Sequence, residues 1–133
     1  MSILFAYCGK ESDKVLDFAI HHSILYSEPL YIATVVKEEQ MDPDNMDESI
    51  RQYMEAAQKR AASQGATVHS IIEVGYKPGE AIIEIAQRFK CDTIIVGRSN
   101  RSALDRLILG SVSNYVVKNA DCHVILVNDV GVY

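Results

Sequence analysis

The sequence predicts a single doubly wound α/β domain built on a parallel β-sheet. Short, continuous apolar runs recur along the 133 residues, as expected of strands that are buried on both faces of a sheet. Segments with helical apolar spacing lie between these runs, so that strands and helices alternate. The connections between successive strands are then right-handed crossovers, and the length suits one domain with its own core.

The first two strands enclose one amphipathic helix. Residues 3–7 form the first apolar run, and Cys8 and Gly9 end it. Ser12 can cap the helix that follows, and Pro29 stops it. A second, β-branched strand is expected over residues 30–36. The predicted buried stripe of the helix consists of Val15, Leu16, Ala19, Ile20 and Ile24.

Two further helices flank the third strand. The polar, proline-containing segment 37–47 predicts an exposed loop, and Gly65 is placed as the C-terminal stop of the helix after it. The third strand is expected over residues 67–74, with Pro78 near the first position of the third helix. The predicted buried residues are Ile50, Met54, Ala57 and Ala61 in the second helix and Ile82, Ile85, Ala86 and Phe89 in the third.

The segment between the last two strands is the predicted functional centre. The fourth strand, residues 93–96, ends at Gly97. A second glycine, Gly110, precedes the hydroxyls of Ser111 and Ser113 in a last helix over residues 111–118. α/β proteins commonly hold phosphate where a strand leads into a glycine turn and a helix N-terminus, because backbone N–H groups and the helix dipole favour an anion there.

Composition and charge exclude several classes of protein. An apolar content of 48% and a charged content of 23% are globular values. No apolar run is long enough to span a bilayer, so no membrane partner is expected. The net charge of −5 argues against general nucleic-acid binding, although the basic residues concentrate between Gly97 and Lys118, where four of them stand with one aspartate.

Cysteine usage and the N-terminus favour a cytoplasmic protein. Cys8, Cys91 and Cys122 are odd in number and lack CxxC spacing, which suits reduced thiols better than disulfides or a zinc site. The first residues show neither a basic region nor a cleavage site, so no signal peptide is expected.

The commonest motifs of small α/β proteins are missing. The segment 97–113 contains neither the GxxxxGK[ST] phosphate loop nor the GxGxxG dinucleotide fingerprint. The paired carboxylates of a receiver domain are absent after the first strand, where Cys8 and Gly9 stand. No combination of nucleophile, base and acid is visible, so an enzyme is not expected.

The spacing that remains resembles the universal stress protein family. Gly97 is followed by two residues and Asn100, then by nine residues and the pair Gly110-Ser111. The family's loop reads glycine, two residues, glycine, nine residues, glycine and then serine or threonine. The flanking segments VGRS and GSVSNYVVKNADCHVILV extend the resemblance, which covers nearly the whole chain.

The resemblance implies a Rossmann-like fold with a five-stranded parallel sheet in the order 3-2-1-4-5 and about four helices. It also implies an adenine nucleotide as ligand, ATP or a related one, with Mg²⁺ only as the counter-ion of the nucleotide. Family members commonly form homodimers through strand five, here His123 to Val127. The nucleotide-binding residues implied by the resemblance are Cys8, Val36, Gly97, Arg98, Asn100, Gly110, Ser111, Val112 and Ser113.

Two departures from the family pattern keep an alternative open. Asn100 stands where nucleotide-binding members have their second glycine, although asparagine tolerates left-handed backbone angles better than other side chains. Cys8 stands where many members have an aspartate, and a thiol is a weak hydrogen-bonding group. One hypothesis is therefore a regulatory nucleotide-binding protein, and a second is a dimeric family member that binds no ATP and acts as a protein-interaction module. The third and least favoured is an enzyme that uses the nucleotide as substrate.

Overall fold

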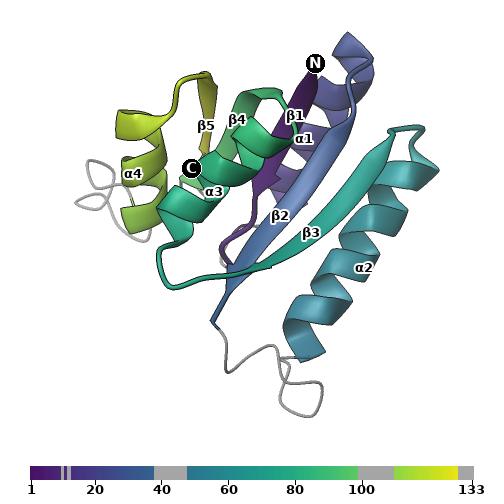
Figure 1. The fold of residues 1–133 in the computed structure, drawn as a ribbon. Coiled ribbons are helices and arrows are strands. Elements are labelled where there is room, and N and C mark those ends of the chain that lie inside the picture. Colours follow the sequence, from purple (N-terminus) through teal and green to yellow (C-terminus); the bar gives the residue numbers. More distant parts are fainter. Residues whose placement is uncertain (10, 12, 38–47, 99–109, 129–133) are drawn as a thin grey trace.

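Five parallel strands and four helices alternate along the chain (Figure 1). The computed structural model describes residues 1–9, 11, 13–37, 48–98 and 110–128. The elements are β1 (Ser2–Ala6), α1 (Asp13–Tyr26), β2 (Leu30–Val36), α2 (Glu48–Ser63), β3 (Val68–Val74), α3 (Pro78–Arg88), β4 (Cys91–Arg98), α4 (Ser111–Asn119) and β5 (His123–Asn128).

The sheet has the strand order β3-β2-β1-β4-β5, and all four pairings are parallel. The predicted fold class and strand order are therefore confirmed. The chain builds outward from β1 to β3 and then returns to the other side of β1 with β4. In open α/β sheets ligands bind outside the carboxyl ends of the strands at such a reversal, which here lies between Ala6 of β1 and Arg98 of β4.

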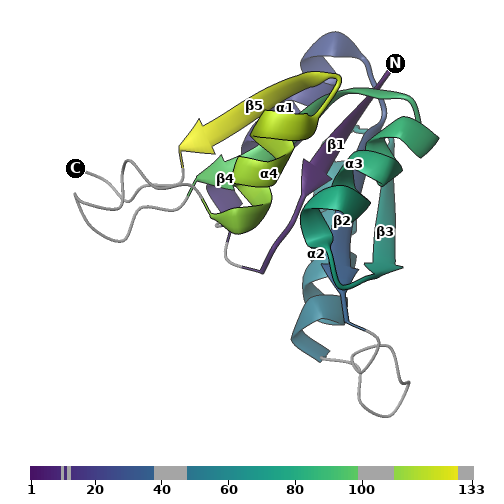
Figure 2. The ribbon, with the colours of Figure 1, turned by 60° about the vertical axis from the view of Figure 1, so that its left-hand side comes forward.

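Two helices cover each face of the sheet (Figure 2). On one face, Phe5 of β1 packs in a cluster with Leu16 and Ile20 of α1 and with residues of α2. On the other face, residues of β1 and β4 pack with Ile82 and Ile85 of α3 and with residues of α4. Each such fully buried aliphatic or aromatic side chain contributes about 1.5–3 kcal/mol through removal from water. The two clusters hold the strand ends in fixed positions.

Helix α1 differs from its prediction at one position of the buried stripe. Ser23 is buried, whereas Ile24 is 39% exposed. The buried residues of α1 centre on the direction of Ser23, and the next residue in a helix points about 100° away. The helix also ends at Tyr26, before the predicted stop at Pro29, with Ser27 at a φ of 54°. Ser12, the predicted cap, and most of the predicted loop 37–47 lie outside the described residues.

The other element predictions are confirmed with small shifts. Gly65 follows α2 with a φ of 95°, and Pro78 is the first residue of α3. Phe89, predicted on the buried face of α3, stands at its C-cap, where it is half-buried and stacks on Tyr31 with 4.7 Å between ring centroids. β4 extends beyond its prediction to Arg98, so Gly97 lies inside the strand, opposite Val127 of β5.

Candidate functional site

The end of β4 and the start of α4 are joined by one side-chain hydrogen bond. The Ser113 hydroxyl donates to the carbonyl oxygen of Gly97 over 3.2 Å, and Ser113 is only 9% exposed. This bond connects positions 16 residues apart in the sequence, on either side of the segment 99–109. The hydroxyl predicted to face a ligand therefore serves in this structure to hold the two ends of that segment together.

Gly97 is required by packing within the described structure. A Cβ built on Gly97 would lie 2.8 Å from Cγ of Glu11 and 3.2 Å from Cγ2 of Val15. The first of these distances is shorter than real Cβ contacts allow. The absent side chain of Gly97, which the family resemblance implies to be a nucleotide-binding residue, thus also admits the start of α1.

The first turn of α4 has no side-chain cap from the described residues. Gly110 is the N-cap residue, with φ −61° and ψ 160°, and no capping hydrogen bond from a side chain is found among these residues. Ser111 is therefore the first helical residue and not the N-cap. Helical geometry leaves the first N–H groups of a helix without intrahelical partners, and Gly110 and Ser111 are both exposed. This turn can donate hydrogen bonds to an anion.

A carboxylate that the sequence analysis missed lies at the end of β1. The backbone N–H of Cys8 donates to Oε2 of Glu11 over 2.9 Å, and Cys8 is exposed. The Cγ atom of Glu11 also lies next to Gly97, 2.8 Å from the position that a Cβ on this glycine would take. Its position in the turn between a buried strand and the following helix was the available signal, because such turns line the carboxyl edge of the sheet. The negative charge of Glu11 therefore lies at the carboxyl edge of the sheet, close to Gly97 of β4.

Two stacked tyrosines flank the same edge of the sheet. The rings of Tyr7 and Tyr53 lie nearly parallel, with centroids 3.6 Å apart. The Tyr53 hydroxyl is buried and has no hydrogen-bond partner among the described residues. Burial, reinforced by nearby negative groups that include Glu11 and Asp13, raises the pKa of Tyr7 and strongly raises the pKa of Tyr53. Both rings therefore stay neutral near pH 7 and act as a wall beside Glu11.

The remaining predicted residues are dispersed around this edge. Val36 ends β2 with 3% exposure, and its carbonyl accepts the N–H of Gly75 over 2.9 Å. Its side chain is therefore part of the packed interior. Arg98 is half-buried at the end of β4, and its Nε is buried without a hydrogen-bond partner among the described residues. Asn100 lies outside the described residues.

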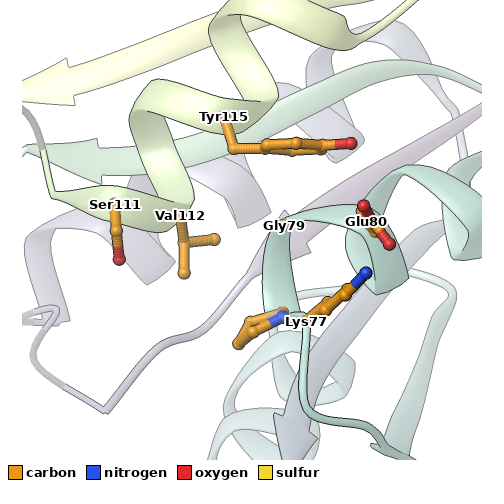
Figure 3. A pocket seen from close by; sticks show the side chains of 7 residues that line it. Lys77, Gly79, Glu80, Ser111, Val112 and Tyr115 are labelled. Carbon is orange, nitrogen blue, oxygen red and sulfur yellow. The ribbon is translucent and has the colours of Figure 1, made fainter.

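A cavity of about 230 Å³ lies between the first turns of α3 and α4 (Figure 3). Its lining includes Ser111 and Val112 from the predicted site and, from the other side, residues that the sequence analysis did not select. The two helices approach closely at Gly79. A Cβ added to this glycine would lie only 2.7 Å from the Tyr115 ring. The lining residues are Lys77, Pro78, Gly79, Glu80, Ser111, Val112 and Tyr115.

Neither a metal cluster nor a membrane helix is found in the part of the chain that the structure describes. No three of its histidine, cysteine, aspartate and glutamate side chains are grouped so as to hold a metal ion. None of its helices is both long and apolar enough to cross a bilayer. All three cysteines lie within this part and form no disulfide.

Comparison with known proteins decides the family. The sequence model of the universal stress protein family matches residues 1–128. The chain belongs to the universal stress protein family. Among its curated relatives, a universal stress protein of Methanocaldococcus jannaschii is 34% identical over 77 residues, which are 58% of this chain and 45% of the relative. The match thus spans less than half of the relative's length.

Solved structures of the family share the fold. A universal stress protein from Archaeoglobus fulgidus in complex with dAMP has a TM-score of 0.76 and 22% identity, over 95% of this chain and 96% of that one. A universal stress protein in complex with cAMP has a TM-score of 0.74 and 25% identity, over 97% of both chains. At these identities the comparisons establish the fold, and each ligand is a property of the protein that contains it.

Proposed function

We propose that this universal stress protein binds an adenine nucleotide, ATP or a related one, as a regulatory ligand at the carboxyl ends of β1 and β4. The nucleotide would be bound rather than turned over, with Mg²⁺ only as its counter-ion. Cys8, Gly97, Arg98, Gly110 and Ser111 lie at the strand and helix ends that would surround it. We also propose that the protein is cytoplasmic, because its three cysteines are free thiols.

The observation that carries this proposal is the uncapped, exposed first turn of α4. The Ser113 hydroxyl fixes that turn to the end of β4 through Gly97, so the N–H groups of the turn keep one direction. An anion placed there is stabilised by those N–H groups and by the helix dipole. The adenine nucleotides in the complexes with dAMP and cAMP supply the ligand class.

Titration of ATP with Mg²⁺ into the purified protein, followed by calorimetry, tests the proposal. We expect saturable binding, and an affinity about 10- to 150-fold lower in Ser111→Ala, because a lost hydrogen bond to a charged group costs about 1.5–3 kcal/mol. Asn119→Ala is the matched control, since Asn119 lies at the other end of α4, where its side chain bonds the carbonyl of Tyr115. Absence of heat at millimolar ATP would refute nucleotide binding, and steady phosphate release would refute a purely regulatory role.

A dimeric protein-interaction module is the second candidate function. It is favoured by the Glu11 carboxylate, which accepts the Cys8 N–H and lies beside Gly97 of the proposed nucleotide site. Its negative charge opposes the binding of phosphates there. The edge strand β5 offers aliphatic side chains for pairing with a second copy. Dimer formation together with the absence of ATP binding would support this candidate over the first.

A further inference from the structure

The cavity between α3 and α4 shares Ser111 and Val112 with the proposed nucleotide site. Its volume of about 230 Å³ is below the roughly 300–1,000 Å³ of pockets that enclose a complete small-molecule ligand. It is therefore suited to one part of a nucleotide, with the rest of the molecule outside. Which part of the nucleotide occupies the cavity depends on the side chains that α3 contributes. None of these side chains is among the nucleotide-binding residues implied by the family resemblance.

Lys77 is the one cation among the residues that line the cavity. Its side chain is exposed at the N-cap position of α3, where it makes no capping hydrogen bond, and it forms no ion pair with any described residue. The one carboxylate in the lining, Glu80, is hydrogen-bonded to Tyr115. A lysine ammonium on a long, flexible stem can move toward an anion at the opposite wall.

Glu80 is held on the Tyr115 side of the cavity. Burial, the charge of Glu80 and the hydrogen bond to Glu80 raise the pKa of the Tyr115 hydroxyl, so this hydroxyl remains a proton donor to the carboxylate near pH 7. Gly79 brings α3 against the Tyr115 ring, which fixes the separation of the two helices. The Glu80 carboxylate is therefore engaged by Tyr115, whereas the Lys77 ammonium is the charged group of the lining that can bind an anion.

We propose that this cavity is a subsite for the phosphoryl groups of the nucleotide and that Lys77 binds them there. The proposal rests on the proposed function and adds a residue from a different element to that site. Figure 3 shows Ser111 on the α4 wall and Lys77 on the α3 wall, with the Lys77 amine directed toward Glu80. The flexible Lys77 stem turns toward α4 when a phosphate binds, so that the phosphate is contacted from both helices. A nucleotide bound in this way connects α3 to α4 and favours ligands with more phosphates.

The rings and aliphatic groups of Pro78, Val112 and Tyr115 also line the cavity, and they suggest the rival occupant. An apolar wall of this kind suits a nucleobase. The two occupants make opposite predictions, because only a phosphoryl subsite makes Lys77 matter for ATP and not for adenosine.

The test measures the affinities of ATP, AMP and adenosine by calorimetry for the wild-type protein, Lys77→Gln, Glu80→Gln and Lys59→Gln. Lys59 is exposed on α2, so its variant removes the same charge at a distance from the cavity. We expect Lys77→Gln to weaken ATP binding about 10- to 150-fold, as for loss of a charged hydrogen bond, and to leave the affinity for adenosine unchanged. Glu80→Gln should tighten ATP binding, because it removes a like charge.

The outcomes separate this inference from the proposed function. If the wild-type protein binds ATP and Lys77→Gln weakens it no more than Lys59→Gln, Lys77 is not a phosphate ligand and the inference is overturned. An equal loss of ATP and adenosine in Lys77→Gln also overturns it, in favour of a nucleobase in the cavity. Failure of the wild-type protein to bind ATP overturns the proposed function and this inference with it. Unchanged circular dichroism and thermal midpoint of Lys77→Gln confirm that its fold is intact.

Discussion

At the scale of single residues, burial controls the thiol chemistry of this protein. Cys91 begins β4 and is 7% exposed. Burial, with smaller effects of Cys122 and Asp92, raises the pKa of Cys91 from 9.0 to about 11. Burial, with smaller effects of Asp92 and Asp121, also raises the pKa of Cys122. Since the thiolate is the reactive form, Cys91 is expected to react slowly with alkylating reagents at neutral pH.

The raised pKa of Cys91 predicts a loss of stability in alkaline solution. Below about pH 9 the thiol is protonated in both states, so it has no effect on the pH dependence there. Between about pH 9 and 11 the unfolded chain releases this proton while the folded chain keeps it. The free energy of unfolding therefore falls as the pH rises, by up to about 2–3 kcal/mol across this range.

Urea unfolding at pH 8, 9 and 10, followed by circular dichroism, measures this slope. The slope should be shallower in Cys91→Ala, because the buried titrating group is gone, and unchanged in Cys8→Ala, where the cysteine is exposed. Equal slopes in the wild-type protein and Cys91→Ala would show that the Cys91 thiol does not cause the alkaline loss.

Residue-scale predictions succeeded where a position depends on local sequence and failed where it depends on a distant side chain. The glycine at 65 was predicted from helix termination alone, and its φ of 95° agrees. The reason for Gly97 was not predictable, because the side chains that need the space, Glu11 and Val15, come from the first quarter of the chain. The Tyr7–Tyr53 stack was missed for the same reason. Glu11, bonded to Cys8 three residues away, was missed although its place in the turn after β1 is a local signal.

At the scale of elements, the contact between α3 and α4 depends on one glycine. A Cβ on Gly79 would lie 2.7–2.9 Å from three carbons of Tyr115, and one of them is Cβ of the tyrosine. Rotation of the ring moves Tyr115 Cδ1 but not its Cβ, so the contact cannot be relieved by a side-chain movement alone. The helices must separate, and with them the walls of the cavity.

Gly79→Ala is therefore predicted to destabilise the protein although alanine is the better helix former. The helix-propensity gain is about 1 kcal/mol, whereas overpacking of a close contact typically costs about 1–3 kcal/mol. We expect a net loss of up to about 2 kcal/mol, measured by urea unfolding. In the double variant Gly79→Ala, Tyr115→Ala the loss should be less than additive, since Cγ and Cδ1 of the tyrosine are gone and only the contact with Cβ remains. Additive losses would mean that the two residues do not limit the helix separation.

Element boundaries were predictable because apolar runs and turn residues mark them, and the bounds of β2 agree with the prediction. The strand order required the family resemblance, since alternation alone leaves several orders possible. The length of β4 was underestimated because Gly97 and Arg98 pair with Val127 and Asn128 of β5, and a glycine followed by a charge signals a turn in the sequence. The cavity was not predictable, because it forms between helices whose first turns lie more than thirty residues apart.

At the scale of the whole molecule, the two edges of the sheet differ in polarity. On β3, the polar side chains of His69 and Ser70 are exposed. Glu73 of the same strand is paired with Arg88 of α3 over 3.0 Å. Such polar groups discourage edge pairing. On β5, residues 124–127 are all aliphatic, and the first three of them are only half-buried. Strand β5 is thus the edge suited to a second copy of the chain.

We therefore expect a homodimer through β5, which light scattering on a size-exclusion column should detect as twice the mass of 14.8 kDa. Ile125 of β5 and Ile72 of β3 are a matched pair, because both are half-buried and pack on the same core cluster from opposite edges. A lysine on an edge strand opposes pairing through its charge, so Ile125→Lys should give a monomer while Ile72→Lys, with a similar packing loss, stays a dimer.

A wild-type monomer at micromolar concentration would contradict dimerisation, and a monomer from Ile72→Lys alone would assign the dimer interface to β3. If ATP binding persists in an Ile125→Lys monomer, the nucleotide site is complete within one chain.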